Sequence, residues 1–186
     1  MTLLDEYSRQ SLAIQVERQI TAAEVLGVLE QAMIQYGVPG YIRSDNGPEF
    51  IATKVQQWLR DSQIKAIYID PGSPWQNGYI ESFHSRFRDE CLSREMLQSL
   101  REARVVIADW RQHYNRERPH SRLDYLSPAD FKKQNTHILN RPIIRSRSQY
   151  YRSIPTIDST PIVGWHSVMQ AICTSTDPPQ PQVFYM

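Results

Sequence analysis

The sequence predicts an α/β fold with one main domain, and three observations support this. Short apolar segments typical of strands alternate with amphipathic helices from Met1 to about Phe131. The 186 residues suit one domain of ordinary size. Hydrophobic residues make up 40% of the chain and aromatic residues 10%, which is enough for a core. Strands that alternate with helices are typical of a sheet covered by helices.

The chain begins in a predicted β-hairpin. The apolar segment Met1–Leu4 runs into the polar turn Asp5–Arg9, and the apolar-rich segment Ser11–Val16 follows. A helix comes next, with Thr21 as its cap and Glu24 as the reciprocal partner three residues later. Its apolar residues recur at helical spacing as far as Tyr36, where Gly37 and Pro39 end it.

The middle of the chain alternates between strand and helix. A short strand begins at Tyr41 and runs into the turn Ser44–Pro48, and a helix is predicted over Thr53–Ser62. The alternating segment Ile64–Ile69 predicts a further strand, followed by the turn-rich loop Asp70–Asn77.

Helices dominate the next part of the chain. One is predicted to begin near Asn77 or Gly78, with Asn77 as its N-cap, and a longer one covers about Ser99–Arg116. A last helical turn is expected near Pro128–Phe131. We therefore predict a core domain at residues 1–133.

The C-terminal part differs in composition. Residues 141–186 hold six of the twelve prolines, and the hydrophobic periodicity is lost. We expect residues 134–186 to form a low-order tail of unknown role.

Charge and cysteine content narrow the class of protein. The net charge is only +1, although residues 1–81 carry six Lys and Arg against ten Asp and Glu, and residues 82–133 carry eleven against eight. This charge difference would fit a metal site beside a phosphate-facing surface, but charge alone favours ordinary solvated surface. Cys91 and Cys173 lie far apart, which argues against a disulfide scaffold or a zinc site. No segment is long and apolar enough to span a membrane, so we expect a soluble cytoplasmic protein with no membrane partner.

Two acidic residues are candidates for a metal site. Asp45 follows a predicted strand, and Glu81 lies one turn into a predicted helix, with one helix, one strand and one loop between them. Ligands of open α/β sheets collect at strand ends, and carboxylates are suitable ligands for divalent ions in phosphodiester chemistry. Each residue also has a structural explanation, because Asp before Asn-Gly forms turns and Glu is favoured in a first helical turn.

The helix that carries Glu81 has further polar residues on the same face. His84, Ser85 and Arg88 follow at i+3, i+4 and i+7, while Phe83 and Phe87 mark the side that packs inward. A carboxylate, an imidazole and a guanidinium together suit contact with phosphate, and an ordinary exposed face is the alternative.

Five motifs in order resemble the catalytic core of bacterial insertion-sequence transposases related to retroviral integrases. They read D-N-G-P-E-F, G-Y-I-E-S-F, F-R-D-E-C-L, H-Y-N-R-E-R-P-H-S-R-L and S-P-A-D-F, and the match as a whole runs from about Leu3 to Phe131. The resemblance implies an RNase H-like fold, a mixed sheet flanked by helices. It also implies an Asp-Asp-Glu triad that binds two Mg²⁺ ions, with Mn²⁺ as a substitute.

The resemblance further implies DNA transposition, in which transposon ends are hydrolysed and the freed 3′-hydroxyl attacks target DNA. Asp45 and Glu81 would be the second and third catalytic and metal-binding residues of the triad. The expected DNA contacts come from the loop beside Asp45 and from the helix of Glu81, namely Asn46, His84, Ser85 and Arg88. Transposon-end and target DNA are the implied partners, a homo-oligomer is the implied assembly, and association with the bacterial nucleoid is the implied location.

The chain departs from the family pattern at its start. The first Asp of the triad lies on a strand upstream of the segment that begins at Leu3, and this strand has no counterpart here. Asp5 matches a strand-end position beside a hairpin turn instead. We therefore expect an N-terminally truncated core that folds marginally on its own. The alternatives are a transposase core completed by sequence outside the chain, an inactive remnant that binds DNA or dimerises with the full-length enzyme, and a nuclease without strand transfer.

Overall fold

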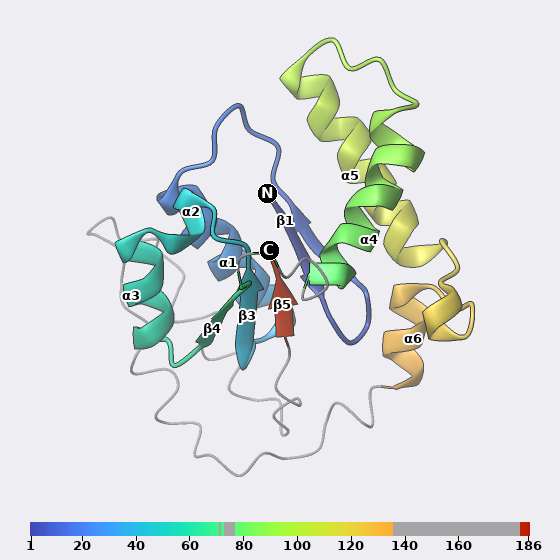
Figure 1. The fold of residues 1–186 in the computed structure, drawn as a ribbon. Helices are drawn as coiled ribbons and strands as arrows, with labels where there is room; N and C mark the ends of the chain where they lie inside the picture. The colour runs from blue at the N-terminus through green and yellow to red at the C-terminus, as the bar shows by residue number, and fades with distance from the viewer. Residues whose placement is uncertain (71, 73–76, 136–182) are drawn as a thin grey trace.

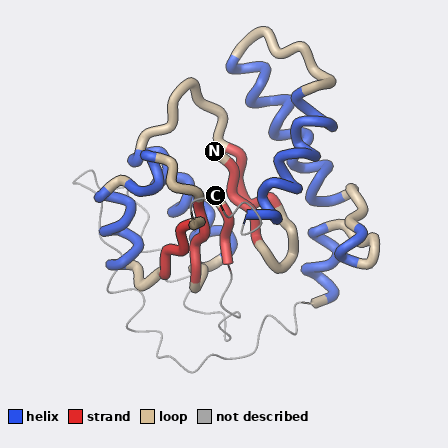
Figure 2. The backbone as a smooth tube through the Cα atoms, viewed as in Figure 1, coloured by secondary structure: helices blue, strands red, loops and turns tan. Residues whose placement is uncertain are grey.

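The computed structural model describes residues 1–70, 72, 77–135 and 183–186, which form a mixed sheet with helices on both faces (Figures 1 and 2). The sheet has five strands in the order β2-β1-β5-β3-β4. Their bounds are Thr2–Asp5 for β1, Ser11–Ile14 for β2, Tyr41–Ser44 for β3, Lys65–Tyr68 for β4 and Val183–Tyr185 for β5.

The sheet combines an antiparallel hairpin with a parallel pair of strands. Strands β1 and β2 pair antiparallel, as predicted, and β3 and β4 pair parallel. Strand β5 joins these two halves, because it runs antiparallel to β1 and parallel to β3. The sheet is therefore continuous only through a strand that comes from the end of the sequence.

The helices cover the sheet in two groups. The structure has α1 (Ala22–Tyr36), α2 (Pro48–Ile51), α3 (Thr53–Asp61), α4 (Gly78–Phe87), α5 (Leu100–Arg116) and α6 (Pro128–Gln134). A π-helical turn, Arg88–Leu92, extends α4, and a 3₁₀ turn, Ser121–Leu123, precedes α6. Among the described residues, no helix has the length and apolar character needed to cross a membrane.

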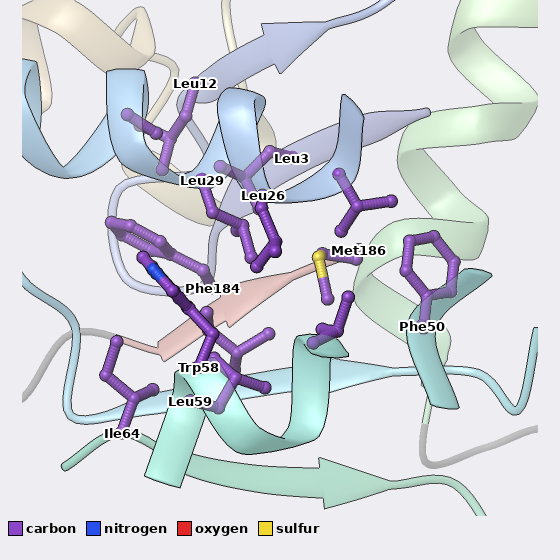
Figure 3. Close-up of a cluster of buried hydrophobic side chains, with 14 residues drawn as sticks. Leu3, Leu12, Leu26, Leu29, Phe50, Trp58, Leu59, Ile64, Phe184 and Met186 are labelled. Atoms are coloured by element: carbon purple, nitrogen blue, oxygen red, sulfur yellow. The ribbon is translucent and has the colours of Figure 1, made fainter. Parts of the chain in front are cut away.

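Two hydrophobic clusters fix these helices to opposite faces of the sheet. The first cluster contains Leu3 from β1 and Phe184 from β5 together with side chains of α1, α2 and α3 (Figure 3). The second contains the neighbouring residues Leu4 and Tyr185 together with side chains of α4 and α5. Successive residues of a strand point to opposite faces, so the adjacent apolar residues of β1 and of β5 bury side chains on both sides of the sheet.

The local signals of the sequence are confirmed at the first helix. Thr21 and Glu24 form the predicted capping box, in which Thr21 N donates to Glu24 Oε2 over 2.7 Å and Glu24 N donates to Thr21 Oγ1 over 3.4 Å. Asn77 occupies the N-cap position of α4, as predicted, but its side chain makes no capping hydrogen bond. Helix α2 and the π-helical turn are additions that the sequence analysis did not anticipate.

The predicted tail is described only in part. Residues 136–182 lie outside the described residues, and the prediction for them stays a prediction. Val183–Tyr185 form the central strand β5, where the sequence analysis expected no regular element. Cys91 is a buried free thiol, and Cys173 lies outside the described residues.

Helix α5 holds the edge strand β2 through side chains. Asn115 Oδ1 accepts a hydrogen bond from Ser11 N over 2.8 Å, and Asn115 Nδ2 donates to Ser11 O over 2.9 Å. Arg111 adds a bond from Nη1 to Leu12 O. The buried polar side chain of Asn115 is thereby satisfied, and α5 is fixed against the hairpin.

The segment between α5 and α6 is held by an ion pair and an aromatic contact. Arg118 makes a bidentate pair with Glu90, with its shortest contact at 2.7 Å. The His120 ring meets Tyr114 edge-on, with ring centroids 4.9 Å apart. Burial, together with the positive charge of Arg118, lowers the pKa of His120 to about 4.

The low pKa of His120 predicts that acid destabilises the protein. The folded state binds its proton less readily than the unfolded chain, whose His pKa is about 6.5. The stabilising effect is therefore complete above about pH 6.5 and is lost as the pH falls towards about 4. Urea denaturation across this range should give a free energy of unfolding that decreases less in His120→Gln than in the wild type. The exposed His113 offers a control, and His113→Gln should keep the wild-type dependence.

Candidate metal and nucleic-acid site

Asp45 lies immediately after β3, at the carboxyl end of two parallel strands. Its side chain is exposed, and its Oδ1 accepts a hydrogen bond from Gly47 N over 3.0 Å. Asn46 Nδ2 donates to Ile69 O over 2.9 Å and so ties this loop to the end of β4. The contact of Asn46 with Ile69 therefore shapes this loop. Asp45 is left facing solvent at the strand end.

Glu81 lies in the first turn of α4 and is also exposed. The neighbouring Ile80 and Phe83 are buried in the second cluster, and this contact orients the helix. Ser85 and Arg88 are exposed further along the same helix, as the helical spacing predicts. Arg88 N donates to the carbonyl oxygens of His84 and Ser85, so the helix continues directly into the π-helical turn.

Both candidate carboxylates affect the electrostatics of His84. Partial burial lowers its pKa, and the positive charges of the Met1 ammonium group and Arg88 add to the effect, while Asp45 and Glu81 oppose it. Both acidic side chains therefore act on the same imidazole although they come from different elements. His84 Nε2 lies 2.7 Å from Thr2 Oγ1 on β1, which fixes the ring between the sheet and the helix.

A third acidic residue lies beside Asp45, and the sequence analysis did not single it out. A Cβ atom placed on Gly47 would lie 3.1 Å from Asp45 Oδ1 and 3.1 Å from Glu49 Oε2, so both carboxylates border the same small space. Glu49 is half-buried in the first turn of α2. Glu49 belongs to the D-N-G-P-E-F motif, and its position in that motif could have identified it as a site residue from the sequence.

The close approach at Gly47 leads to a testable prediction. The φ of Gly47 is −57°, so alanine is strained there only by the crowding of its Cβ, which would displace the two carboxylates. We expect Gly47→Ala to weaken Mn²⁺ binding about tenfold, as loss of supporting contacts does in other metal sites. Calorimetric titration with Mn²⁺ would measure this.

Gly27→Ala is the matched control for Gly47→Ala. Gly27 lies in α1, and nothing lies within 4 Å of an added Cβ. This variant should leave Mn²⁺ binding unchanged and stabilise the helix by about 0.5–1 kcal/mol. Equal Mn²⁺ affinities in the two variants would contradict the role of the close approach at Gly47.

The donor chemistry fits a hard divalent ion. Mg²⁺ typically binds through one or two protein carboxylates, with substrate phosphates and water completing its shell. Asp45 and Glu81 provide two such groups. Within the described part of the chain, no group of three or more His, Cys, Asp or Glu side chains lies close enough to hold a metal ion.

Two other regions named by the sequence analysis lie outside this arrangement. Asp5 is buried, and its carboxylate accepts hydrogen bonds from Ser8 N and Ser8 Oγ, so it supports the hairpin turn. Trp75 and Gln76, in the loop before α4, lie outside the described residues.

Comparison with known sequences finds one family over most of the described region. Two family profiles, both described as integrase core domain, match residues 1–74 and 62–128. An uncharacterized 39.2 kDa protein of insertion element IS476 from Xanthomonas euvesicatoria is 47% identical over 131 residues, which cover 70% of this chain and 38% of that protein. The transposase of insertion sequence element IS904 from Lactococcus lactis is 32% identical over 100 residues, which cover 53% of this chain and 40% of that protein. The chain thus spans about two fifths of the length of these relatives.

Comparison with solved structures identifies the fold. The catalytic core domain of BIV integrase superposes with a TM-score of 0.58 and 21% sequence identity, covering 74% of this chain and 86% of that domain. The expected RNase H-like mixed sheet flanked by helices is thereby confirmed.

Proposed function

Because residues 1–128 match its two profiles, the chain belongs to the integrase core domain family, as found in bacterial insertion-sequence transposases, and we propose that it acts in DNA transposition. The reaction proposed is metal-dependent phosphodiester cleavage followed by strand transfer. The observation that supports the proposal is the position of Asp45 at the carboxyl end of the parallel strands, together with the electrostatic effect that Asp45 and Glu81 both have on His84.

The proposed roles follow from the chemistry of each side chain. Asp45 and Glu81 would hold Mg²⁺ or Mn²⁺, and a divalent ion stabilises the charge that develops on phosphate oxygens during cleavage. Arg88 and Ser85 would contact the DNA backbone, since they are exposed on the same helix. His84 would position the Glu81 face against β1 through Thr2. The proposed partners are transposon-end and target DNA at the bacterial nucleoid, with the active form a homo-oligomer.

The number of carboxylates supports a second candidate function. A two-ion site in this chemistry requires a further carboxylate, and the described residues offer no group of three metal-binding side chains. The chain would then bind DNA, or pair with full-length transposase, without catalysing cleavage. Glu49 is an additional acid that borders the same space beside Gly47 as Asp45 does.

A cleavage and joining assay would separate these functions. The chain is incubated with labelled duplex carrying the ends of its insertion sequence, with Mg²⁺ or with a chelator. Joined products that require Mg²⁺ would support transposition, and nicked products without joining would indicate a nuclease. Binding without either product would identify a DNA-binding chain that lacks activity.

Arg88 gives a prediction that holds for each DNA-binding function. Arg88→Ala should weaken DNA binding and reduce the slope of log K against log salt concentration by about one, because one phosphate contact is lost. Fluorescence anisotropy at several salt concentrations would measure both effects. The control is Arg60→Ala, which removes an exposed arginine from α3 on the other face of the sheet and should leave the slope unchanged. An unchanged slope in Arg88→Ala would place Arg88 away from phosphate.

A further inference from the structure

The central strand of the sheet is its shortest and is the most distant in sequence from its neighbours. Strand β5 pairs Leu4 with Tyr185 and Asp5 with Phe184 on one side, and pairs Tyr41, Ile42 and Arg43 with Val183, Phe184 and Tyr185 on the other. Two further backbone bonds extend this pairing, from Glu6 N to Val183 O over 2.9 Å and from Met186 N to Arg43 O over 2.8 Å. Without β5, both β1 and β3 would present an unpaired edge in the middle of the sheet.

The position between β1 and β3, which we call the β5 slot, selects an apolar strand. Phe184 and Tyr185 are fully buried there. Phe184 and Met186 enter the first cluster, whereas Tyr185 packs in the second, where its ring meets that of Tyr79 edge-on at 5.5 Å. An occupant of the slot therefore needs apolar side chains on both faces and must run parallel to β3.

Strand β5, which fills the slot, is separated in sequence from the preceding helix by a long segment of chain. Helix α6 ends at Gln134, and β5 begins at Val183. At about 3.3 Å per residue, the intervening chain has a maximum reach of roughly 150 Å, several times the width of a domain of this size. The same length of chain can therefore deliver β5 to the slot of its own copy or to the slot of a second copy.

We propose that the β5 slot exchanges its strand between two copies of this chain, so that Val183–Met186 of each copy completes the sheet of the other. Every contact of β5 is the same in the closed and the exchanged form. The two forms therefore differ in the entropy that each loses. The closed form loses the entropy of closing one long loop, and this loss grows slowly with loop length. The exchanged form instead loses the entropy of association. A second copy is the partner that fits the slot, because it carries the same apolar segment on the same long connection.

The exchange would also link the copies at the candidate site. Met186 N donates to Arg43 O, so the end of β5 lies beside a residue that is two positions before Asp45 in the sequence. In the exchanged dimer, this part of each site is built by the other copy. The exchange itself is independent of the proposed DNA chemistry, so its test needs no activity.

A mixed disulfide tests the exchange directly. Tyr41 and Val183 are partly buried partners across β3 and β5. One full-length variant carries Tyr41→Cys, a second carries Val183→Cys, and both also carry Cys91→Ala and Cys173→Ala. After incubation together and mild oxidation, a linked pair containing one of each variant should exceed by at least about tenfold the linked pairs formed by either variant alone. No excess of the mixed pair would overturn the proposal.

The mass of the wild-type chain provides an independent measurement. Light scattering should show a species of twice 21.7 kDa whose fraction grows with protein concentration. Phe184→Asp places a charge in the slot and should abolish this dimer, while Met96→Asp, which alters a side chain that is 86% exposed, should retain it. A strictly monomeric wild type, or a dimer that persists in Phe184→Asp, would refute strand exchange.

Discussion

Glu81→Gln is expected to abolish the Mg²⁺-dependent cleavage proposed for this chain and to leave its fold intact. Glutamine keeps the size of the side chain and removes the negative charge that a divalent ion requires. Changing groups that only support a metal ligand already costs about 10–100-fold, so loss of a direct ligand should exceed about 100-fold. The structural cost should be small, because Glu81 is exposed and the packing of α4 rests on Ile80 and Phe83.

The measurement pairs cleavage rates with Mn²⁺ affinity, and the control is Glu95→Gln. Glu95 is an exposed glutamate beyond the π-helical turn, so its substitution makes the same chemical change outside the site. Both variants should keep the wild-type circular dichroism spectrum. Wild-type cleavage or Mn²⁺ affinity in Glu81→Gln would remove this residue from the site, whereas a lost spectrum would reveal a structural role.

Phe184→Ala is expected to destabilise the protein by about 3–5 kcal/mol, the usual cost of truncating a buried phenylalanine. Total stabilities of domains are about 5–15 kcal/mol, so this would be a large share. The strand hydrogen bonds are retained, since alanine changes no backbone group, and the loss would report on packing in the first cluster (Figure 3).

Urea denaturation of the full chain would measure this loss. Val105→Ala offers a control, because Val105 lies on α5 and is 65% exposed, and its effect should stay within about 0.5 kcal/mol. If Phe184→Ala also changed the free energy of unfolding by less than about 0.5 kcal/mol, β5 would contribute nothing to stability in solution. The same experiment tests the expectation that the chain folds only marginally.

The parts of the fold that the sequence predicted are those with local signals. The capping box at Thr21 and Glu24 involves residues three apart, and the helical spacing of Phe83 and Phe87 indicated which side of α4 packs inward. Asp45 was placed at a strand end because the turn residues that follow it are adjacent in sequence. Each of these features depends on residues that are close together in the sequence, so it could be recognised from the sequence alone.

The parts that were missed depend on contacts between distant residues. Strand β5 has only three residues, and its partners in β1 and β3 lie more than a hundred residues away, so no periodicity or turn signal marks it. The contact of His84 with Thr2 also joins residues that are distant in the sequence, since it links a helix to the first strand. The nearness of Glu49 to Asp45 depends on the path of the chain around Gly47, which the motif alone does not define.

The two hydrogen bonds between Asn115 and Ser11 have a consequence for how the protein resists aggregation. Strand β2 is an outer strand, and the unpaired backbone of such a strand invites further chains to add on and build larger aggregates. The amide of Asn115 offers Ser11 one acceptor and one donor, as the backbone of a neighbouring strand would, and Arg111 covers the next carbonyl. Side chains from α5 thus imitate a terminal strand and block this route of self-association.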